Sequence, residues 1–333
     1  MSARPQLHGI LIKVDNFQSV NQLITLNHLP REAQMFALFY GDKTNLRRLK
    51  MFKRFCSVLI LLIVISLAAP AAFAQTSPPP VNENDARLLA DNPWVKRIKT
   101  NGVLRVGFDI FRPWAMQAKD DKYIGFEMQV AEALAADMGV KVEFVPTAWD
   151  GIIPALLTGR FDIIIGGIGI TEERAKRVAF TEPYEFSGMG IAASKISAPG
   201  LTTLDEFNQK DMIVVAKSGT TAALAAKELL PQATLKTFDH EDQTAQELRS
   251  GKAQALISSA PYPSELALKN PNEIYVPVSG TLTREPCGMA LNPRDKDALP
   301  GLNAWIAARF ASGWLEKTWS YWFETLDWEP QLK

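Results

Sequence analysis

An arginine near the start of a short predicted helix is the first residue that could do chemistry. It lies in the stretch GGIGITEERAKRVAFTEPY, Gly166 to Tyr184, where Thr171 suits a helix N-cap and two glutamates follow it. Acids are favoured in the first turn of a helix, whereas a cation such as Arg174 costs about 0.3–1 kcal/mol there. We therefore expect a neighbouring acid or a bound anion to compensate the charge of Arg174.

Histidine and cysteine are too scarce for most other site chemistries. Beyond residue 74 the chain has one histidine, His240, which lies beside Asp239 and Glu241 in a polar stretch. A Ser-His-Asp triad would have to use it, and a histidine-rich metal site cannot be built. We expect His240 to be a solvated loop residue, and we expect no metal and no cofactor. Cys287 is the one cysteine of the same region, so no disulfide is predicted within it.

The composition indicates a globular chain of one or two domains. Of 333 residues, 47% are hydrophobic and 22% are charged, and the formal net charge is zero. No basic stripe accompanies this balance, so nucleic acid is not an expected partner. Residues 1–74 hold nine of the 36 Lys/Arg and three of the 36 Asp/Glu, which leaves 27 against 33 and a mildly acidic remainder.

The N-terminal region contains a predicted secretory signal over residues 51–74. It has two basic residues, an apolar run from about Val58 to Ala69, and small residues before Gln75. A membrane anchor is the alternative interpretation, but the apolar run is short for a bilayer span. Because signals normally start a chain, Met51 is the predicted initiator and residues 1–50 are an upstream artefact. Cleavage before Gln75 would release the protein into the periplasm.

Beyond a linker over residues 75–95, apolar strands and helical patterns alternate, and the same order occurs twice. The first unit, strand-helix-strand-helix-strand, reads VLRVGF, FEMQVAEALAADMG, VKVEFVP, GIIPALLTG and FDIIIGG. The second unit, between about 212 and 259, reads MIVVAK, TAALAAKELLP, ATLKTF, DQTAQELRSG and AQALISS. Such alternation builds parallel sheets covered by helices. The predicted fold class is therefore α/β, with two Rossmann-like lobes.

Polar residues and glycines follow these strands at the ends where such sheets bind ligands. Asp109 follows the first strand, Gly167 ends the third, residues 218–221 follow the first strand of the second unit, and Ser259 ends its last strand. Open α/β sheets bind ligands at the carboxyl ends of their strands. We expect the two lobes to face each other across one cleft, with Arg174 at its rim.

Five motifs, in order, resemble the periplasmic amino-acid-binding proteins of ABC importers, the solute-binding family that includes the histidine- and glutamine-binding proteins. They are GVLRVGFDIFRPW, GFEMQVAEALAADMG, WDGIIPALLTGRFDIIIGG, ITEERAKRVAFTEPY and VVAKSGTTAA, and the resemblance covers nearly all of residues 96–333. It implies a type II periplasmic binding protein fold, with lobe 1 over residues 96–192 and 284–333 and lobe 2 over residues 193–283. Two crossing strands, near Ile191 to Ala193 and Arg284 to Gly288, would join the lobes.

The resemblance also implies how the protein works. A monomer in the periplasm would close on a small ligand that carries a carboxylate, an amino acid or a related solute, and would then dock on a membrane permease. Arg174 would hold the carboxylate, since a planar guanidinium matches two carboxylate oxygens with parallel N–H groups. An ion pair between Arg174 and Glu182 or another neighbouring acid is the alternative.

Other residues of the site follow from the same resemblance. Thr221, as the first residue of a helix, would reach the carboxylate from the second lobe, and Lys217 would either add charge or point to solvent. Trp149, with Phe111 and Trp114, resembles the aromatic residues around the ligand side chain, although Trp114 could instead belong to the core. The five tryptophans from 305 to 328 are predicted to pack C-terminal helices. The complete candidate site is Asp109, Phe111, Trp114, Trp149, Gly167, Gly169, Thr171, Arg174, Lys217, Gly219, Thr220, Thr221 and Ser259.

Two positions depart from the family's pattern. Ser259 stands where the family has an aspartate that binds the α-ammonium of the ligand, and Gly169 stands where a serine often helps. Asp109 or Glu127 could substitute for the missing anion, or the ligand could lack a free α-amine. Recognition of a carboxylate is expected in either case.

An enzyme is the alternative function, because a few relatives of this fold are cyclohexadienyl dehydratases. Such an enzyme needs a general acid, and the predicted cleft offers the carboxylates of Asp109 and Glu127 but no histidine. Fold alone does not settle function. We expect a binding protein rather than an enzyme.

Overall fold

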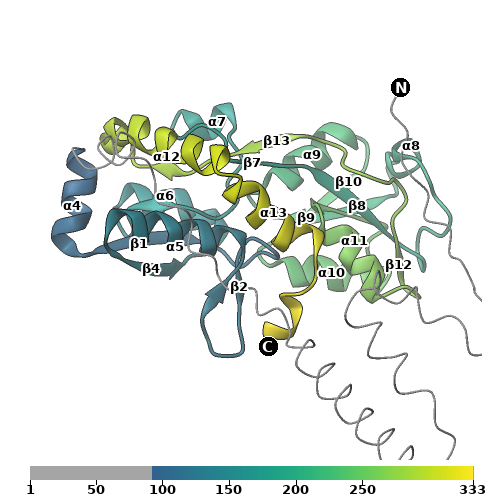
Figure 1. Ribbon diagram of the computed structural model, residues 1–333. Coiled ribbons are helices and arrows are strands. Elements are labelled where there is room, and N and C mark those ends of the chain that lie inside the picture. Colours follow the sequence, from purple (N-terminus) through teal and green to yellow (C-terminus); the bar gives the residue numbers. More distant parts are fainter. Residues whose placement is uncertain (1–91, 333) are drawn as a thin grey trace, which may run out of the picture. The chain divides into compact units, whose positions relative to one another are not determined.

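The first lobe is built on a five-stranded sheet in the computed structural model, which describes residues 92–332 of the chain (Figure 1). Its strands are β1 (Val103–Phe108), β4 (Lys141–Pro146), β5 (Ile163–Ile164), β6 (Ala179–Phe180) and β14 (Ala290–Leu291). The order is β4-β1-β5-β14-β6, with β1 parallel to β4 and β5, and β14 antiparallel to β5 and β6. The predicted strand VLRVGF is β1, which is largely buried, as the central strand of a covered sheet must be.

Helices cover this sheet on both sides. Sequence signals set their ends: α5 stops at Gly139, whose φ of 70° is the left-handed conformation that glycine adopts at helix ends. The helices of the first lobe are α4 (Pro93–Asn101), α5 (Phe126–Met138), α6 (Ile152–Leu157), α7 (Glu172–Ala175), α12 (Leu299–Ala311) and α13 (Trp314–Glu324). Smaller elements are β2 (Met116–Gln117), β3 (Tyr123–Ile124), and the 3-10 turns η2 (Trp149–Gly151), η3 (Pro293–Ala298) and η4 (Glu329–Gln331).

The second lobe has its own five-stranded sheet in the order β10-β9-β11-β8-β12. The strands are β8 (Met189–Ser194), β9 (Ile213–Lys217), β10 (Thr234–Phe238), β11 (Ala255–Ser259) and β12 (Ile274–Tyr275), and the helices are α8 (Leu204–Phe207), α9 (Thr221–Leu229), α10 (Glu241–Arg249) and α11 (Tyr262–Lys269). β9 runs parallel to β10 and β11, whereas β8 runs antiparallel to β11 and β12. Two α/β lobes confirm the predicted fold class.

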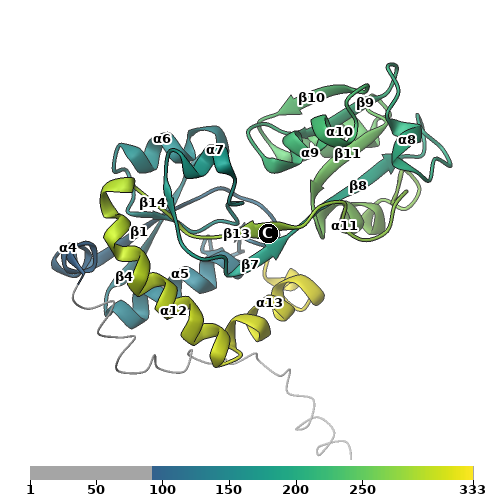
Figure 2. The ribbon, with the colours of Figure 1, turned by 90° about the horizontal axis from the view of Figure 1, so that it is seen from above.

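Two paired strands connect the lobes, as Figure 2 shows. These are β7 (Glu185–Ser187) and β13 (Glu285–Cys287), which pair antiparallel with Phe186 opposite Pro286. The second predicted crossing, Arg284 to Gly288, contains β13. The first prediction, Ile191 to Ala193, lies further along the chain than the crossing, because these residues are buried in β8 inside the sheet of the second lobe.

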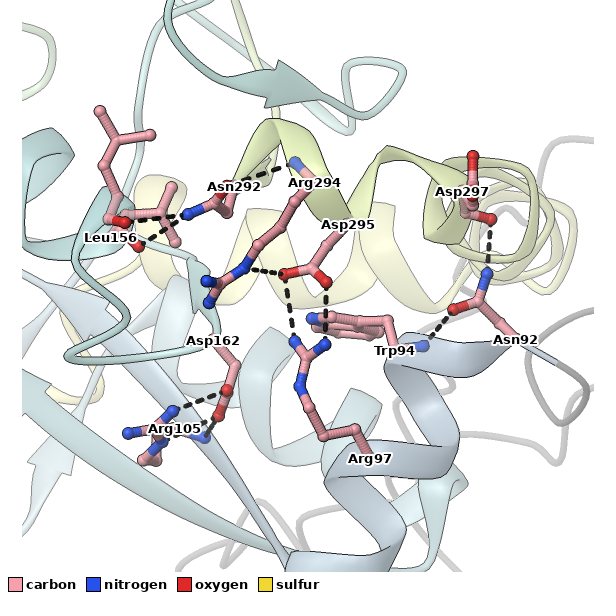
Figure 3. Close-up of polar contacts among 11 residues, drawn as sticks. Asn92, Trp94, Arg97, Arg105, Leu156, Asp162, Asn292, Arg294, Asp295 and Asp297 are labelled. Atoms are coloured by element: carbon pink, nitrogen blue, oxygen red, sulfur yellow. Dashed lines mark hydrogen bonds and ion pairs between the residues drawn. The ribbon is translucent and has the colours of Figure 1, made fainter.

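Helix α4 is capped at its N-terminus and tied to η3 of the first lobe by polar contacts (Figure 3). The Asn92 side chain caps it by accepting from the Trp94 amide at 2.8 Å, and the Arg97 guanidinium donates to both oxygens of Asp295 at 2.9 and 3.1 Å. Trp94 and Val95 are buried in the core. The last residues of the predicted linker over residues 75–95 are therefore part of a packed helix; the rest of that linker and the predicted signal lie outside the described residues.

The C-terminal helices close the same core. Trp305, Trp314, Trp322 and Trp328 are buried in one cluster with β1, and Trp319 packs against that cluster, as the sequence predicted for these tryptophans. Among residues 92–332 no helix has both the length and the apolar character that a membrane span needs.

Candidate functional site

A small cavity lies between the lobes, at the carboxyl ends of strands from both sheets. Its volume is about 50 Å³. We call it the cleft cavity, and its lining is Phe111, Trp114, Trp149, Gly166, Gly167, Arg174, Lys217, Thr220, Thr221, Ala222, Glu241 and Ser259. Drug-sized ligand sites reach roughly 300 Å³ or more, so the cleft cavity is small by comparison. Of the candidate residues, Asp109, Gly169, Thr171 and Gly219 are not in this lining but contact residues that are.

Arg174 lies on α7 with its side chain turned into the cleft cavity. The Thr171 hydroxyl caps α7 by accepting from the Arg174 amide at 3.2 Å. Arg174 Nη1 donates to the Gly169 carbonyl at 2.9 Å, and Arg174 Nη2 donates to the Gly219 carbonyl at 3.1 Å. Within the part of the chain that the structure describes, no salt bridge to Arg174 is found, with Glu182 or with another acid.

The guanidinium of Arg174 is thus partly buried, with carbonyls as its hydrogen-bond partners, and Glu285 and Glu173 act on its charge only from beyond ion-pair distance. Burial lowers the pKa of its guanidinium, because the charged form loses water. The Trp149 ring lies 5.7 Å from the guanidinium carbon and supplies a weak cation–π contact. An anion that entered the cleft cavity would restore the missing partner.

Gly219 joins the two lobes at this point. Its carbonyl accepts from Arg174 and also from the Trp149 indole at 3.2 Å, and both donors belong to the first lobe. Its φ of 69° favours glycine, and a Cβ there would lie 2.3 Å from a carboxylate oxygen of Asp150. The loop at Gly219 can therefore approach the first lobe closely only without a side chain.

Aromatic rings form one wall of the cleft cavity. Phe111 and Trp114 stack with centroids 5.0 Å apart and planes 15° apart. Trp114 is 2% exposed and donates from its indole to Glu185 at 3.0 Å, so it belongs to the core and to the cavity wall at once. A Cβ on Gly167, whose φ is 67°, would lie 2.8 Å from the Trp114 ring. Glycine at position 167 thus leaves the room that the Trp114 ring occupies.

The N-terminus of α9 forms the opposite wall. Thr220 is its N-cap and accepts from the Ala223 amide at 3.3 Å, while Thr221 is its first residue, as predicted. The first amides of a helix have no partner within it. Those of Thr221 and Ala222 stand where Arg174 also faces the cavity, and together they suit an anion.

Lys217 and Asp109 form an ion pair across the lobes. Lys217 Nζ lies 2.6 Å from Asp109 Oδ2, with 6% and 19% of the two side chains exposed. The two charges therefore compensate each other. Lys217 is buried, so the expected exposure to solvent is wrong, whereas the expectation that it adds charge for a ligand stays a prediction, since Lys217 lines the cleft cavity.

Glu127, the other proposed substitute anion, lies beneath the site rather than in its lining. It is fully buried on α5 and accepts from the Gly167 amide at 2.8 Å and from the Tyr184 hydroxyl at 2.5 Å. Burial, with the charge of Glu185 nearby, raises the pKa of Glu127 to about 8. Glu127 thus supports the Gly167 loop through its hydrogen bond from the Gly167 amide.

Glu241 is a lining residue that the sequence reasoning missed. It is the first residue of α10, and its Oε1 is buried without a hydrogen-bond partner. Burial raises the pKa of Glu241 to about 7, although Ser258 lies close enough to favour the charged carboxylate. The sequence did hold a signal for Glu241. Glu241 begins the helix that follows β10 and so lies near the carboxyl end of a strand, where such sheets bind ligands. His240, which drew attention instead, is exposed at the N-cap.

Comparisons with known proteins found a family model, individual relatives and solved structures that are similar to this chain. Residues 104–325 match the model of the bacterial extracellular solute-binding proteins, family 3. The L-cystine-binding protein TcyJ of Escherichia coli K12 is 28% identical over 236 residues, 71% of this chain and 88% of TcyJ.

Two solved structures are similar as well. One is the ancestral amino acid-binding protein AncCDT-1, described as a precursor of cyclohexadienyl dehydratase, with 39% identity, a TM-score of 0.63, and coverage of 69% of this chain and 99% of that one. The other is a putative binding component of an ABC transporter from Wolinella succinogenes in complex with lysine, with 36% identity, a TM-score of 0.64, and coverage of 69% and 99%.

Proposed function

The chain belongs to the bacterial extracellular solute-binding proteins, family 3, and from this premise we propose that it captures an amino acid or a related carboxylate between its lobes. The observation that carries the proposal is Arg174, a partly buried guanidinium in the cavity lining with no carboxylate at ion-pair distance, opposite the amides at the start of α9. The loaded protein would then deliver its ligand to the membrane permease of an ABC importer. It would act in the periplasm as a monomer, after cleavage before Gln75.

Capture would proceed by opening and closing about β7 and β13. In the closed arrangement the Gly219 carbonyl accepts hydrogen bonds from Arg174 and Trp149. Opening frees these donors, and a carboxylate can then accept two parallel N–H groups from Arg174 and further ones from Thr221 and Ala222. Phe111, Trp114 and Trp149 would enclose the rest of the ligand. Closure excludes water and strengthens each of these charged contacts.

A thermal-shift screen tests the binding function directly. The protein starting at Gln75 is heated with single amino acids, dicarboxylates and betaines, because a ligand that binds only the folded state must stabilise it. At 100 times its Kd a ligand adds about 2.7 kcal/mol to the free energy of unfolding. A panel in which no carboxylate raises Tm would contradict the proposed function.

Replacement of Arg174 by alanine tests the site. We expect Arg174→Ala to lose about 2 to 5 kcal/mol of binding free energy for any ligand found in the screen, with the fold intact. Arg177→Ala is the matched control, since Arg177 is an exposed arginine that follows α7 closely. Calorimetry that finds near-normal affinity in Arg174→Ala would refute the carboxylate assignment.

A dehydratase is the second candidate function. It is favoured by Glu241, whose pKa of about 7 suits a general acid at neutral pH, and by the likeness to a precursor of cyclohexadienyl dehydratase. Purified protein incubated with prephenate or arogenate distinguishes the two functions. Turnover that disappears in Glu241→Gln would establish the enzyme, whereas binding without turnover would favour transport.

A further inference from the structure

We propose that Glu241 is the carboxylate that pairs with a cationic group of the ligand, so that the site selects solutes with both a carboxylate and an ammonium group. This inference rests on the proposed function and names the substrate class of the same cavity. It also gives a role to a residue outside the motifs that carry the family resemblance.

The free oxygen of Glu241 carries the argument. A buried carboxylate oxygen without a hydrogen-bond partner is costly, because desolvation of a charged acceptor is not repaid. Glu241 lines the same cavity as Arg174, whose cation likewise lacks a carboxylate. A ligand with an anionic and a cationic group would satisfy both residues at once.

The two acids proposed as substitutes for the family aspartate are already committed. Asp109 is 2.6 Å from Lys217, and both oxygens of Glu127 accept hydrogen bonds from Gly167 and Tyr184. Ser259 lines the cavity with a neutral hydroxyl, which contacts Met189 Sδ at 3.8 Å. Within the described part of the lining, Glu241 is therefore the one acidic side chain.

None of the charged groups around Glu241 named below takes the place of a cationic partner. Lys217 favours its charged form from β9, but the ammonium group of Lys217 is held by Asp109. Asp242 on the same helix opposes the charge. Burial, and after it the charge of Glu241, raises the pKa of the Tyr262 hydroxyl on α11. A cation from the ligand would lower the pKa of Glu241 from about 7, so binding would release a proton near neutral pH.

Four probes separate the charges of the ligand. L-lysine carries a carboxylate and two ammonium groups, L-norleucine keeps only the α-ammonium, 6-aminohexanoate keeps only the terminal one, and hexanoate has neither. We expect the wild-type protein to bind L-lysine and at least one single-ammonium probe ten times or more tighter than hexanoate. Glu241→Gln should abolish that preference and leave the Kd of hexanoate unchanged. Glu228→Gln, an exposed acid on α9 of the same lobe, is the control.

Each outcome of this series has one meaning. Wild-type protein that binds L-lysine and hexanoate equally, or Glu241→Gln protein that keeps the preference for an ammonium, overturns the inference and leaves the proposed function standing. If neither these probes nor the amino acid panel binds wild type, the proposed function fails and the inference falls with it. Loss of hexanoate and L-lysine binding together in Glu241→Gln would indicate a structural role and would also overturn it.

Proton release gives a second readout that a structural role would not move. Calorimetry of L-lysine binding at pH 7 in two buffers of different ionisation enthalpy should show proton release by the wild type, and affinity should rise between pH 6 and 8. Glu241→Gln should show neither effect. Proton uptake by the wild type would mean that Glu241 binds as an acid to a ligand oxygen, and would overturn the pairing with a cation.

Discussion

At the scale of single residues, Glu127 shows how a buried carboxyl supports the site without touching the ligand. Its pKa of about 8 exceeds the ordinary value of 4.5 because the charged form is desolvated. Between these values the unfolded chain releases a proton that the folded protein keeps, so the free energy of unfolding falls as pH rises from 4.5 to 8. We expect Glu127→Gln to flatten this fall by on the order of a few kcal/mol.

Urea unfolding at pH 5, 6.5 and 8 measures the effect. Some pH dependence should remain, since burial also raises the pKa of Glu185 to about 7. Glu316→Gln, an exposed acid on α13, should leave the wild-type profile unchanged. An equally steep fall in Glu127→Gln would show that Glu127 is ionised in the folded protein.

At the scale of elements, α4 illustrates how a short helix adds to a core. One face buries Trp94, Val95 and Ile98, while Arg97 holds Asp295 at its rim. We expect Trp94→Ala to lower the free energy of unfolding by about 3 to 5 kcal/mol, because it leaves a large cavity. Trp94→Phe should cost far less, since it fills most of the space and removes an indole N–H that has no partner.

Chemical denaturation of both variants checks this comparison. Lys99→Ala, on the exposed face of α4, should change the free energy of unfolding little. Similar losses for Trp94→Phe and Trp94→Ala would show that the indole N–H matters more than the packing.

At the scale of the whole of residues 92–332, ion pairs hold the lobes together beside the cleft cavity. Arg112 of the first lobe lies 2.6 Å from Glu265 on α11, and Lys269 of the same helix lies 2.5 Å from Glu329. Lys269 and Arg112 hold the pKa of Glu329 below its ordinary value. In the proposed mechanism these contacts favour the closed state, and a ligand that binds this state gains from them.

Breaking one such pair should weaken binding from a distance. We expect Glu265→Gln to raise the Kd for L-lysine up to about fivefold, since a partly exposed ion pair contributes about 0.2–1 kcal/mol. Glu273→Gln is the matched control, because Glu273 pairs with Arg249 inside the second lobe at 2.6 Å. Equal Kd values for the wild type and Glu265→Gln would show that this pair does not bias closure.

The sequence by itself determined the elements and the general place of the site. Apolar runs and helical periodicity depend on which side chains each element buries, so they predicted β1, α5, β4, β9, α9 and β10 close to their observed bounds. The rule that ligands bind at the carboxyl ends of strands placed Arg174 and Thr221 at one cleft, the family resemblance added Trp149, and all three line the cavity. The resemblance that followed from these motifs agreed with the family that matches the chain.

Only the tertiary structure decided which charges meet. Lys217 and Asp109 are 108 residues apart, and their pairing depends on the approach of two lobes that no local pattern encodes. The same holds for Glu127, which turned out to be a buried support, and for the crossing strand, which lies before β8 rather than in it. Glu241 follows β10 as an ordinary first-turn acid of a helix. It becomes a candidate ligand contact only because folding buries one of its oxygens in the cleft, while Asp109 and Glu127 have other partners.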